Sequence, residues 1–382
     1  MAENKSDITF NRAQILGREM EYIRASVEKM HISGDGPFTR ACSELLADHL
    51  SVHAALLTTS CTAALEMAAL LLDCGPGDEI IMPSFGFVSI ANAVALRGAK
   101  PVFADVRQET LNLDERAVAN LINERTKAVL AIHYAGVACK MNELVDLCAR
   151  HDLALIEDTA HALFATYHGK PLGSFGRFST LSFHETKNLS CGEGGALLLT
   201  QPADLERAEW IRDKGTNRQQ LFRGEVDKYT WVDLGSSYVL SDLLAAFLLG
   251  QLEQRDKVAS ARQQIWNRYD AAFRGRLDER LEVQLPHLPE GCAGADHMYW
   301  MMFPSLEMRS RFIEWMREER ITCVSHYQPL NASKMGRSIG AQAGSCPVAE
   351  RAADTLVRLP FFNDLSQADQ QRVIDRALEF GG

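Results

Sequence analysis

Ala128-Val129-Leu130-Ala131-Ile132 is a short, wholly apolar run, and Leu153-Ala154-Leu155-Ile156 repeats the pattern after an intervening helical segment. Apolar strands that alternate with helices are typical of a parallel sheet with helices on both faces. These two runs therefore predict an α/β fold with a mostly parallel sheet.

Three further apolar runs extend this pattern over residues 55–200, and turn sequences rich in Gly and Pro separate them. In such sheets, ligands bind at the carboxyl ends of the strands, so we expect functional side chains directly after the runs. The three runs are Glu79–Met82, Pro101–Ala104 and Ala196–Leu199.

The pattern changes beyond residue 240. A long helical stretch over 241–274 is followed by a predicted strand over 297–303, a helix over 310–319 and a strand over 322–324. We therefore expect two domains: a large one over residues 1–255, and a smaller C-terminal α+β domain over residues 256–382.

Composition narrows the class of protein. The 382 residues include 40 basic and 50 acidic side chains, a net charge of −10, which disfavours binding to nucleic acid. The longest apolar stretch, 63–72, contains Glu66 and is far shorter than the roughly 20 residues that span a bilayer. With no apolar segment near the N-terminus, we expect a cytoplasmic protein with no membrane partner. The nine cysteines form no C-x-x-C pair, so we expect reduced thiols rather than a disulfide framework or a zinc site.

Two polar sites lie beside the predicted strands. Thr58-Thr59-Ser60-Cys61-Thr62-Ala63-Ala64-Leu65-Glu66 opens a helix, and the N–H groups of a helix start suit a phosphate. Ordinary N-capping would explain the same Ser and Thr residues. Asp158 follows the strand at Leu153–Ile156, where it is placed either to bind a ligand or to cap a helix.

A third site is Ser182-Phe183-His184-Glu185-Thr186-Lys187-Asn188, ahead of a glycine-rich turn. Lys187 beside an apolar strand could be desolvated and nucleophilic, although a lone lysine is usually a solvated surface group. A phosphate-binding helix start, a carboxylate and a lysine are together the parts that hold pyridoxal phosphate.

The sequence resembles the DegT/DnrJ/EryC1/StrS family of sugar aminotransferases, pyridoxal-phosphate enzymes of fold type I. The resemblance runs from Phe10 to Phe362. The stretches that carry it are Gly34–Thr39, Ser60–Asp73, His133–Cys139, Ser182–Asn188, Lys214–Arg218 and Asp227–Trp231.

The resemblance implies a role for each residue of the three sites. Lys187 would bind the cofactor covalently and later move the substrate proton, and Asp158 would keep the pyridine nitrogen protonated. His161, where many members have Gln, would donate a hydrogen bond to the phenolic oxygen. Phe87 would stack on the ring, with a plain core aromatic as the alternative. The residues that would hold the phosphate end of the cofactor are Cys61, Thr62, Ala63 and Ser182.

The resemblance also implies a homodimer with active sites at the subunit interface. Ser237 stands where many members have an Asn that reaches the phosphate from the neighbouring subunit. Residues 212–228 hold five basic and three acidic side chains, which suits a nucleotide diphosphate, although an ordinary mixed solvated loop would look alike. The expected substrate-binding residues are Lys214, Asn217, Arg218, Tyr229, His326 and Tyr327.

The activity implied is transfer of the amino group of L-glutamate to the C4 ketone of a dTDP-keto sugar, dTDP-4-keto-6-deoxy-D-glucose, giving the 4-amino-4,6-dideoxy-D-galactose product. Formation of the gluco epimer, amination at C3, and a UDP-sugar substrate stay open, as does a cofactor-binding regulatory protein without turnover. A metal hydrolase built on His133, His161 and His184 is disfavoured because no second helical His follows His184-Glu185.

Overall fold

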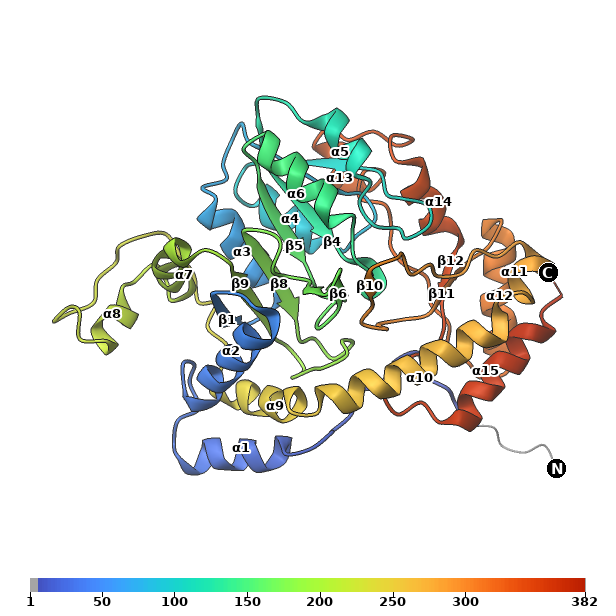
Figure 1. Ribbon diagram of the computed structural model, residues 1–382, viewed down its shortest axis with the longest axis horizontal. Coiled ribbons are helices and arrows are strands. Elements are labelled where there is room, and N and C mark those ends of the chain that lie inside the picture. The colour runs from blue at the N-terminus through green and yellow to red at the C-terminus, as the bar shows by residue number, and fades with distance from the viewer. Residues whose placement is uncertain (1–5, 382) are drawn as a thin grey trace.

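A seven-stranded sheet forms the centre of the computed structural model, which describes residues 6–381 (Figure 1). The strand order is β1-β9-β8-β5-β4-β2-β3, and every neighbouring pair is parallel except the two that involve β9. The prediction of an α/β fold with a mostly parallel sheet is confirmed. The strands are β1 Ala54–Thr58, β2 Glu79–Pro83, β3 Lys100–Ala104, β4 Thr126–Ile132, β5 Ala154–Asp158, β8 Phe178–Ser182 and β9 Gly195–Leu199.

All five apolar runs of the sequence are strands of this sheet, but the sequence missed two strands and one direction. The strands β1 and β8 were not predicted; β8 reads Phe-Ser-Thr-Leu-Ser, too polar for the pattern. The antiparallel direction of β9 follows from the short connection between β8 and β9, which leaves no room for a crossover helix.

Alternate residues of the strands face two different cores, as the period of a strand requires. Ala128, Leu130 and Ile132 of β4 pack in the core under α3, whereas Val129 and Ala131 pack in the core under α6. The first face is covered by α3 Cys61–Leu71, α4 Ser89–Ala95 and α7 Leu205–Arg212, and the second by α5 Glu115–Leu121, α6 Met141–Arg150, α2 Pro37–Leu50 and α9 Asp242–Leu252.

The predicted long helix over 241–274 is two helices, α9 and α10 Arg255–Phe273, separated by Glu253 and Gln254. Helix α1, Glu19–Glu28, packs on α9, and α10 runs from there to the C-terminal part of the chain (Figure 1). Two short strands, β6 Thr166–Tyr167 and β7 Lys170–Pro171, lie in the chain between β5 and β8, and the short helix α8 Arg218–Phe222 lies between α7 and α9.

The C-terminal part has its own apolar core, built from α10 and the elements after it. The predicted strand over 297–303 is the shorter β11, and the predicted strand over 322–324 is a single bridge between Val324 and Arg358. The division into domains at residue 255 coincides with the start of α10 and stays a prediction. The elements are α11 Leu277–Leu281, β10 Cys292–Ala293, β11 Trp300–Met302, α12 Leu306–Glu318, α13 Lys334–Ser338, α14 Pro347–Thr355, β12 Leu356–Arg358 and α15 Gln367–Glu379.

Within residues 6–381, no helix combines the length and the apolar character needed to cross a bilayer.

Candidate active site

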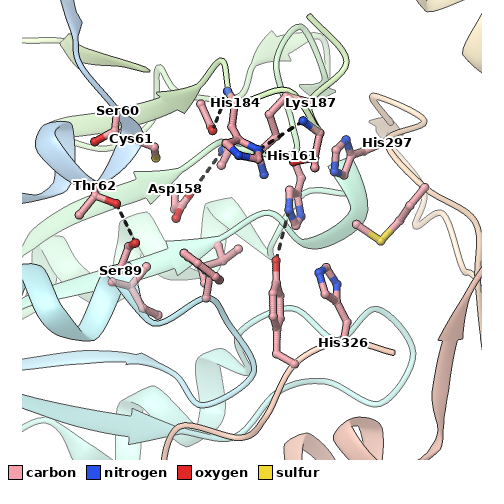
Figure 2. Close-up of a pocket in the computed structure, with 18 of the residues that line it drawn as sticks. Ser60, Cys61, Thr62, Ser89, Asp158, His161, His184, Lys187, His297 and His326 are labelled. Atoms are coloured by element: carbon pink, nitrogen blue, oxygen red, sulfur yellow. Dashed lines mark hydrogen bonds between the residues drawn. The ribbon is translucent and has the colours of Figure 1, made fainter. Parts of the chain in front are cut away.

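A cavity of about 680 Å³ lies at the carboxyl ends of β4, β5 and β8, where the strands end at Ile132, Asp158 and Ser182. The start of α3 and residues of the C-terminal part close the rest of its wall (Figure 2). Nine of the residues expected to bind the cofactor or the substrate line it: Cys61, Thr62, Phe87, Asp158, His161, Ser182, Lys187, His326 and Tyr327.

The start of α3 is a tightly built corner of the cavity. Ser60 caps the helix, because its Oγ accepts the N–H of Ala63 at 3.0 Å. The Oγ1 of Thr62 lies 2.7 Å from the Oγ of Ser89 on α4, so two hydroxyls stand together at the helix start (Figure 2). Gly195 of β9 presses against the same turn, and a Cβ at that residue would lie 2.4 Å from the backbone nitrogen of Cys61.

Asp158 and Lys187 face the cavity as a buried acid and a half-buried base. The Oδ1 of Asp158 accepts the N–H of Ala160 at 2.9 Å. Burial raises the pKa of Asp158, with the charge of Lys187 acting against the shift. Burial likewise lowers the pKa of Lys187, and here the charge of Asp158 opposes the change. A desolvated lysine with a lowered pKa has a larger neutral, nucleophilic fraction.

Histidine rings form the wall opposite the start of α3. The rings of His161 and His297 stack with centroids 4.3 Å apart, and the Nε2 of His161 lies 3.4 Å from the Oη of Tyr327 (Figure 2). The Nδ1 of His326 lies 3.1 Å from the Oη of Tyr134. Burial lowers the pKa of all three histidines, so they are neutral rings.

A buried pair behind the cavity holds the end of β5. Glu157 accepts a hydrogen bond from His133 Nε2 at 3.0 Å and the N–H groups of Gly173, Phe175 and Gly176 at 2.9, 2.7 and 2.7 Å. The backbone N–H of His133 donates to the carbonyl of Asp158. The position of Asp158 is therefore fixed from the far side of the sheet.

The expected substrate-binding residues of the basic loop do not line this cavity. They lie in the segment 213–238, which projects from the body of the molecule around α8 (Figure 1). Lys214 Nζ and Asp213 Oδ1 are 2.5 Å apart, and Asn217 Oδ1 accepts the N–H of Thr230 at 2.7 Å. The structure thus separates Lys214, Asn217, Arg218, Tyr229 and Ser237 from His326 and Tyr327 of the same chain.

Sequence reasoning missed several residues of the cavity wall. Ser89 opens α4, a hydroxyl at a helix start that the same reasoning used at Ser60 would have found. His297 and Arg358 stand inside apolar stretches with no motif around them, so no local signal marks them. Phe87, in contrast, is 60% exposed at the cavity and is not a core aromatic.

The alternative of a metal hydrolase built on three histidines does not match the positions of these side chains. Across the part of the chain that the structure describes, no three His, Cys, Asp or Glu side chains gather as metal ligands. His133 instead pairs with Glu157, and His184 bonds Thr186. Burial raises the pKa of the Cys61 thiol, which is therefore not a thiolate.

The donors in this cavity fit pyridoxal phosphate. The helix start and the paired hydroxyls of Thr62 and Ser89 suit its phosphate. The Nδ1 of His161 is buried and has no partner among the described residues, so it is available to the ring oxygen. Lys187 and Asp158 are the nucleophile and the acid that this cofactor requires.

Comparison with known proteins identifies the group to which the chain belongs. The family model of the DegT/DnrJ/EryC1/StrS aminotransferases matches residues 14–378. The dTDP-4-dehydro-2,3,6-trideoxy-D-glucose 4-aminotransferase of Saccharopolyspora spinosa is 33% identical over 94% of both chains. The GDP-perosamine synthase of Caulobacter vibrioides is 30% identical, also over 94% of both.

Two solved structures share the whole architecture. The aminotransferase TlmJ from Streptoalloteichus hindustanus superimposes with a TM-score of 0.90 at 29% identity, over 98% of both chains. The protein Spr1654 from Streptococcus pneumoniae, in its form with pyridoxamine phosphate, gives 0.90 at 25% identity, over 97% of this chain and 98% of that one. The chain belongs to the DegT/DnrJ/EryC1/StrS aminotransferase family, and it is a pyridoxal-phosphate-dependent sugar aminotransferase.

Proposed function

We propose that the protein transfers the amino group of L-glutamate to the C4 ketone of dTDP-4-keto-6-deoxy-D-glucose and forms dTDP-4-amino-4,6-dideoxy-D-galactose. The observation that carries the amino transfer is that Lys187, half-buried and with a lowered pKa, faces the same cavity as Asp158 at the carboxyl ends of the central strands. The name of the Saccharopolyspora spinosa relative supports a dTDP-sugar and amination at C4.

Each residue of the cavity has a defined task in this proposal. Bound pyridoxal phosphate supplies an electron sink and a carrier for the amino group. Asp158 holds a proton at the pyridine nitrogen, and burial keeps water away from this ion pair. The Nζ of Lys187 would hold the cofactor and would carry the proton of the substrate carbon. His161 donates to the phenolic oxygen, and Phe87 packs on the ring.

The phosphate lies, in this proposal, at the start of α3. The backbone N–H groups of Cys61 and Thr62 belong to the first turn of α3, where N–H groups have no partner within the helix. The hydroxyls of Thr62 and Ser182 add donors from two elements. The N–H of Ala63 is already bonded to Ser60, so its part is to shape the turn.

We also propose a homodimer in which the segment 213–238 completes the active site of the second copy. This segment carries large apolar side chains that are mostly exposed in one chain: Phe222, Tyr229, Trp231 and Leu234 are 62%, 52%, 74% and 54% exposed. Several large apolar side chains exposed on one segment are typical of a contact surface. Lys214, Asn217, Arg218, Tyr229 and Ser237 would then reach the sugar nucleotide and the cofactor phosphate of the partner.

A panel of keto sugars tests the proposal. The protein, loaded with pyridoxal phosphate, is incubated with L-glutamate and with dTDP- or UDP-linked 3-keto and 4-keto sugars, and the product is identified by NMR. We expect amination of the dTDP-4-keto sugar with an axial amino group at C4, the galacto configuration. The assignment of sugar, carbon and configuration would have to change if the amino group were equatorial, if C3 were aminated or if the UDP-sugar were preferred. If no sugar were aminated, the proposed function would be overturned.

A further inference from the structure

Arg358 is a cation on the wall of the cavity that no acidic side chain neutralises. It ends strand β12 and lines the cavity together with Lys187 and Tyr327. Among residues 6–381, no carboxylate pairs with it, whereas most arginines of the structure that show contacts have an acidic partner. Its charge therefore faces the cavity without a carboxylate beside it.

The surroundings of Arg358 hold its guanidinium in one place and leave donors free. The guanidinium lies over the ring of Phe10, 4.5 Å from the centroid, and Nη2 donates to the carbonyl of Ser325 at 3.3 Å. The Nε is buried and has no partner. Burial lowers the pKa of Arg358, with Tyr134 and Tyr327 acting in the other direction. Arginine nonetheless keeps its charge in proteins, and a half-buried guanidinium without a carboxylate partner is only partly solvated, so an anion would stabilise it.

No other group of the cavity supplies that anion. Of the two acidic side chains on the wall, Asp158 interacts with Lys187, and Glu193 lies 3.7 Å from His184. The neighbouring histidines are neutral, as shown above. The unbalanced charge at Arg358 is therefore complemented by a negatively charged part of a substrate.

Both substrates, the amino acid and the sugar nucleotide, are anionic. The place of Arg358 relative to Lys187 favours the amino acid as its ligand. The two side chains share one cavity, and the charge of Arg358 contributes to the lowered pKa of Lys187. In an amino acid, the α-carboxylate is two bonds from the amino nitrogen that reacts. In a 4-keto sugar nucleotide, the whole hexose ring separates the reacting carbon from the diphosphate. A cation in the same cavity as the reacting lysine therefore matches the carboxylate better than the phosphates.

We propose that Arg358 binds the α-carboxylate of the amino donor through its planar fork of N–H groups. This inference rests on the proposed function, because it assumes that an amino acid donates the nitrogen. Arg358 would make the enzyme selective for donors that carry an α-carboxylate, and it would do so from the C-terminal part of the chain, opposite the residues that hold the cofactor.

The two half-reactions, followed separately by the absorbance of the bound cofactor, test the proposal. In Arg358→Leu, we expect the apparent dissociation constant for L-glutamate to rise by roughly 10- to 100-fold, the range of a hydrogen-bonded charge. Arg358→Lys should recover part of the loss. 4-Aminobutyrate, which is glutamate without its α-carboxylate, should react poorly with the wild type and no worse with Arg358→Leu. The amino sugar nucleotide should react with an unchanged apparent dissociation constant.

Calorimetric titration with 2-methylglutamate, which has no α-hydrogen to lose, compares donor binding by the wild type and by Arg358→Leu without turnover. Arg351→Leu, an exposed arginine on α14 just before β12, is the control and should leave both half-reactions unchanged. Weaker binding of the sugar nucleotide alone would place a phosphate at Arg358 and overturn the proposal, as would unaltered glutamate binding in a folded variant. A wild-type protein that reacts with neither glutamate nor any keto sugar would refute the proposed function itself.

Discussion

His133 and Glu157 form a fully buried pair, with Nε2 of the ring 3.0 Å from Oε2 of the carboxylate. The N–H of Cys139 donates to Nδ1 of the same ring at 3.1 Å, which places the ring proton on Nε2, facing Glu157. Glu157 immediately precedes Asp158, so this pair anchors the strand end that presents the cofactor's acid.

Replacing Glu157 with Gln should destabilise the protein by about 3 kcal/mol, because two of its four N–H partners would face an amide nitrogen and the other two would lose a charged acceptor. Urea unfolding followed by circular dichroism measures the change. The exposed Glu318, which pairs with Arg376 at the surface, is the matched control, and its Gln variant should change the free energy of unfolding by less than about 0.5 kcal/mol.

The pair of His133 and Glu157 also predicts how the free energy of unfolding depends on pH. Burial alone would raise the pKa of Glu157, but the bonds from His133, Gly176 and Gly173 outweigh it and hold the pKa below its ordinary value of 4.5. A group with a lowered folded-state pKa stabilises the fold above the unfolded-state value and loses that contribution as the pH falls through the folded-state value. The stability gap between wild type and Glu157→Gln should therefore narrow below about pH 4.5. A gap that widens in acid would contradict the assignment.

Lys187→Ala should abolish covalent attachment of the cofactor while leaving the fold intact. The wild type, reduced with borohydride and digested, should yield one modified peptide that contains Lys187, and its visible absorbance should vanish on reduction. The variant should give no such peptide and no amino transfer. Lys170→Ala, an exposed lysine away from the cavity, should behave as the wild type. Full turnover by Lys187→Ala would refute the role of this lysine.

Local patterns in the sequence determine most of the strands of this protein but not every residue of its cavity. The five apolar runs were sufficient for five of the seven strands and for Asp158, which ends one of them, because burial imposes a pattern on consecutive residues. Lys187 and the start of α3 follow the two strands that were missed, and the glycine-rich turn and the Ser and Thr residues of a helix start marked them instead. Arg358 has no such signal. Its role depends on which side chains of distant segments surround it, Phe10 and Tyr134 among them, and this is a property of the tertiary structure.

Gly195→Ala should weaken cofactor binding more than any ordinary Gly→Ala change. Its new Cβ would meet the backbone of Ser60 and Cys61 at 2.4 Å, and the start of α3 would have to move. We expect a loss of roughly 2 kcal/mol in stability and about a tenfold weaker affinity for pyridoxal phosphate, measured by fluorescence titration. Gly75→Ala is the control, since nothing lies within 4 Å of the Cβ position there. Unchanged affinity in Gly195→Ala would place the phosphate elsewhere.

If each active site is shared between two subunits, two different inactive variants should restore activity when they form a mixed dimer. Lys187→Ala removes the reacting lysine from its own cavity, whereas a variant with both Lys214 and Arg218 changed to Ala leaves that cavity intact and damages only what the projecting segment offers to a partner. Each variant alone should form inactive or nearly inactive dimers. When the two are unfolded, mixed in equal amounts and refolded together, half of the dimers should be hybrids with one intact site.

The mixture should therefore recover about a quarter of the wild-type activity, the statistical value for a two-fold dimer with shared sites. Trp231→Asp, which puts a charge at the most exposed of the four large apolar side chains of this segment, should reduce the mass measured by light scattering to that of a monomer and abolish the activity. If the projecting segment served only its own chain, each hybrid subunit would keep its defect, and the refolded mixture would show no more activity than the two variants measured apart.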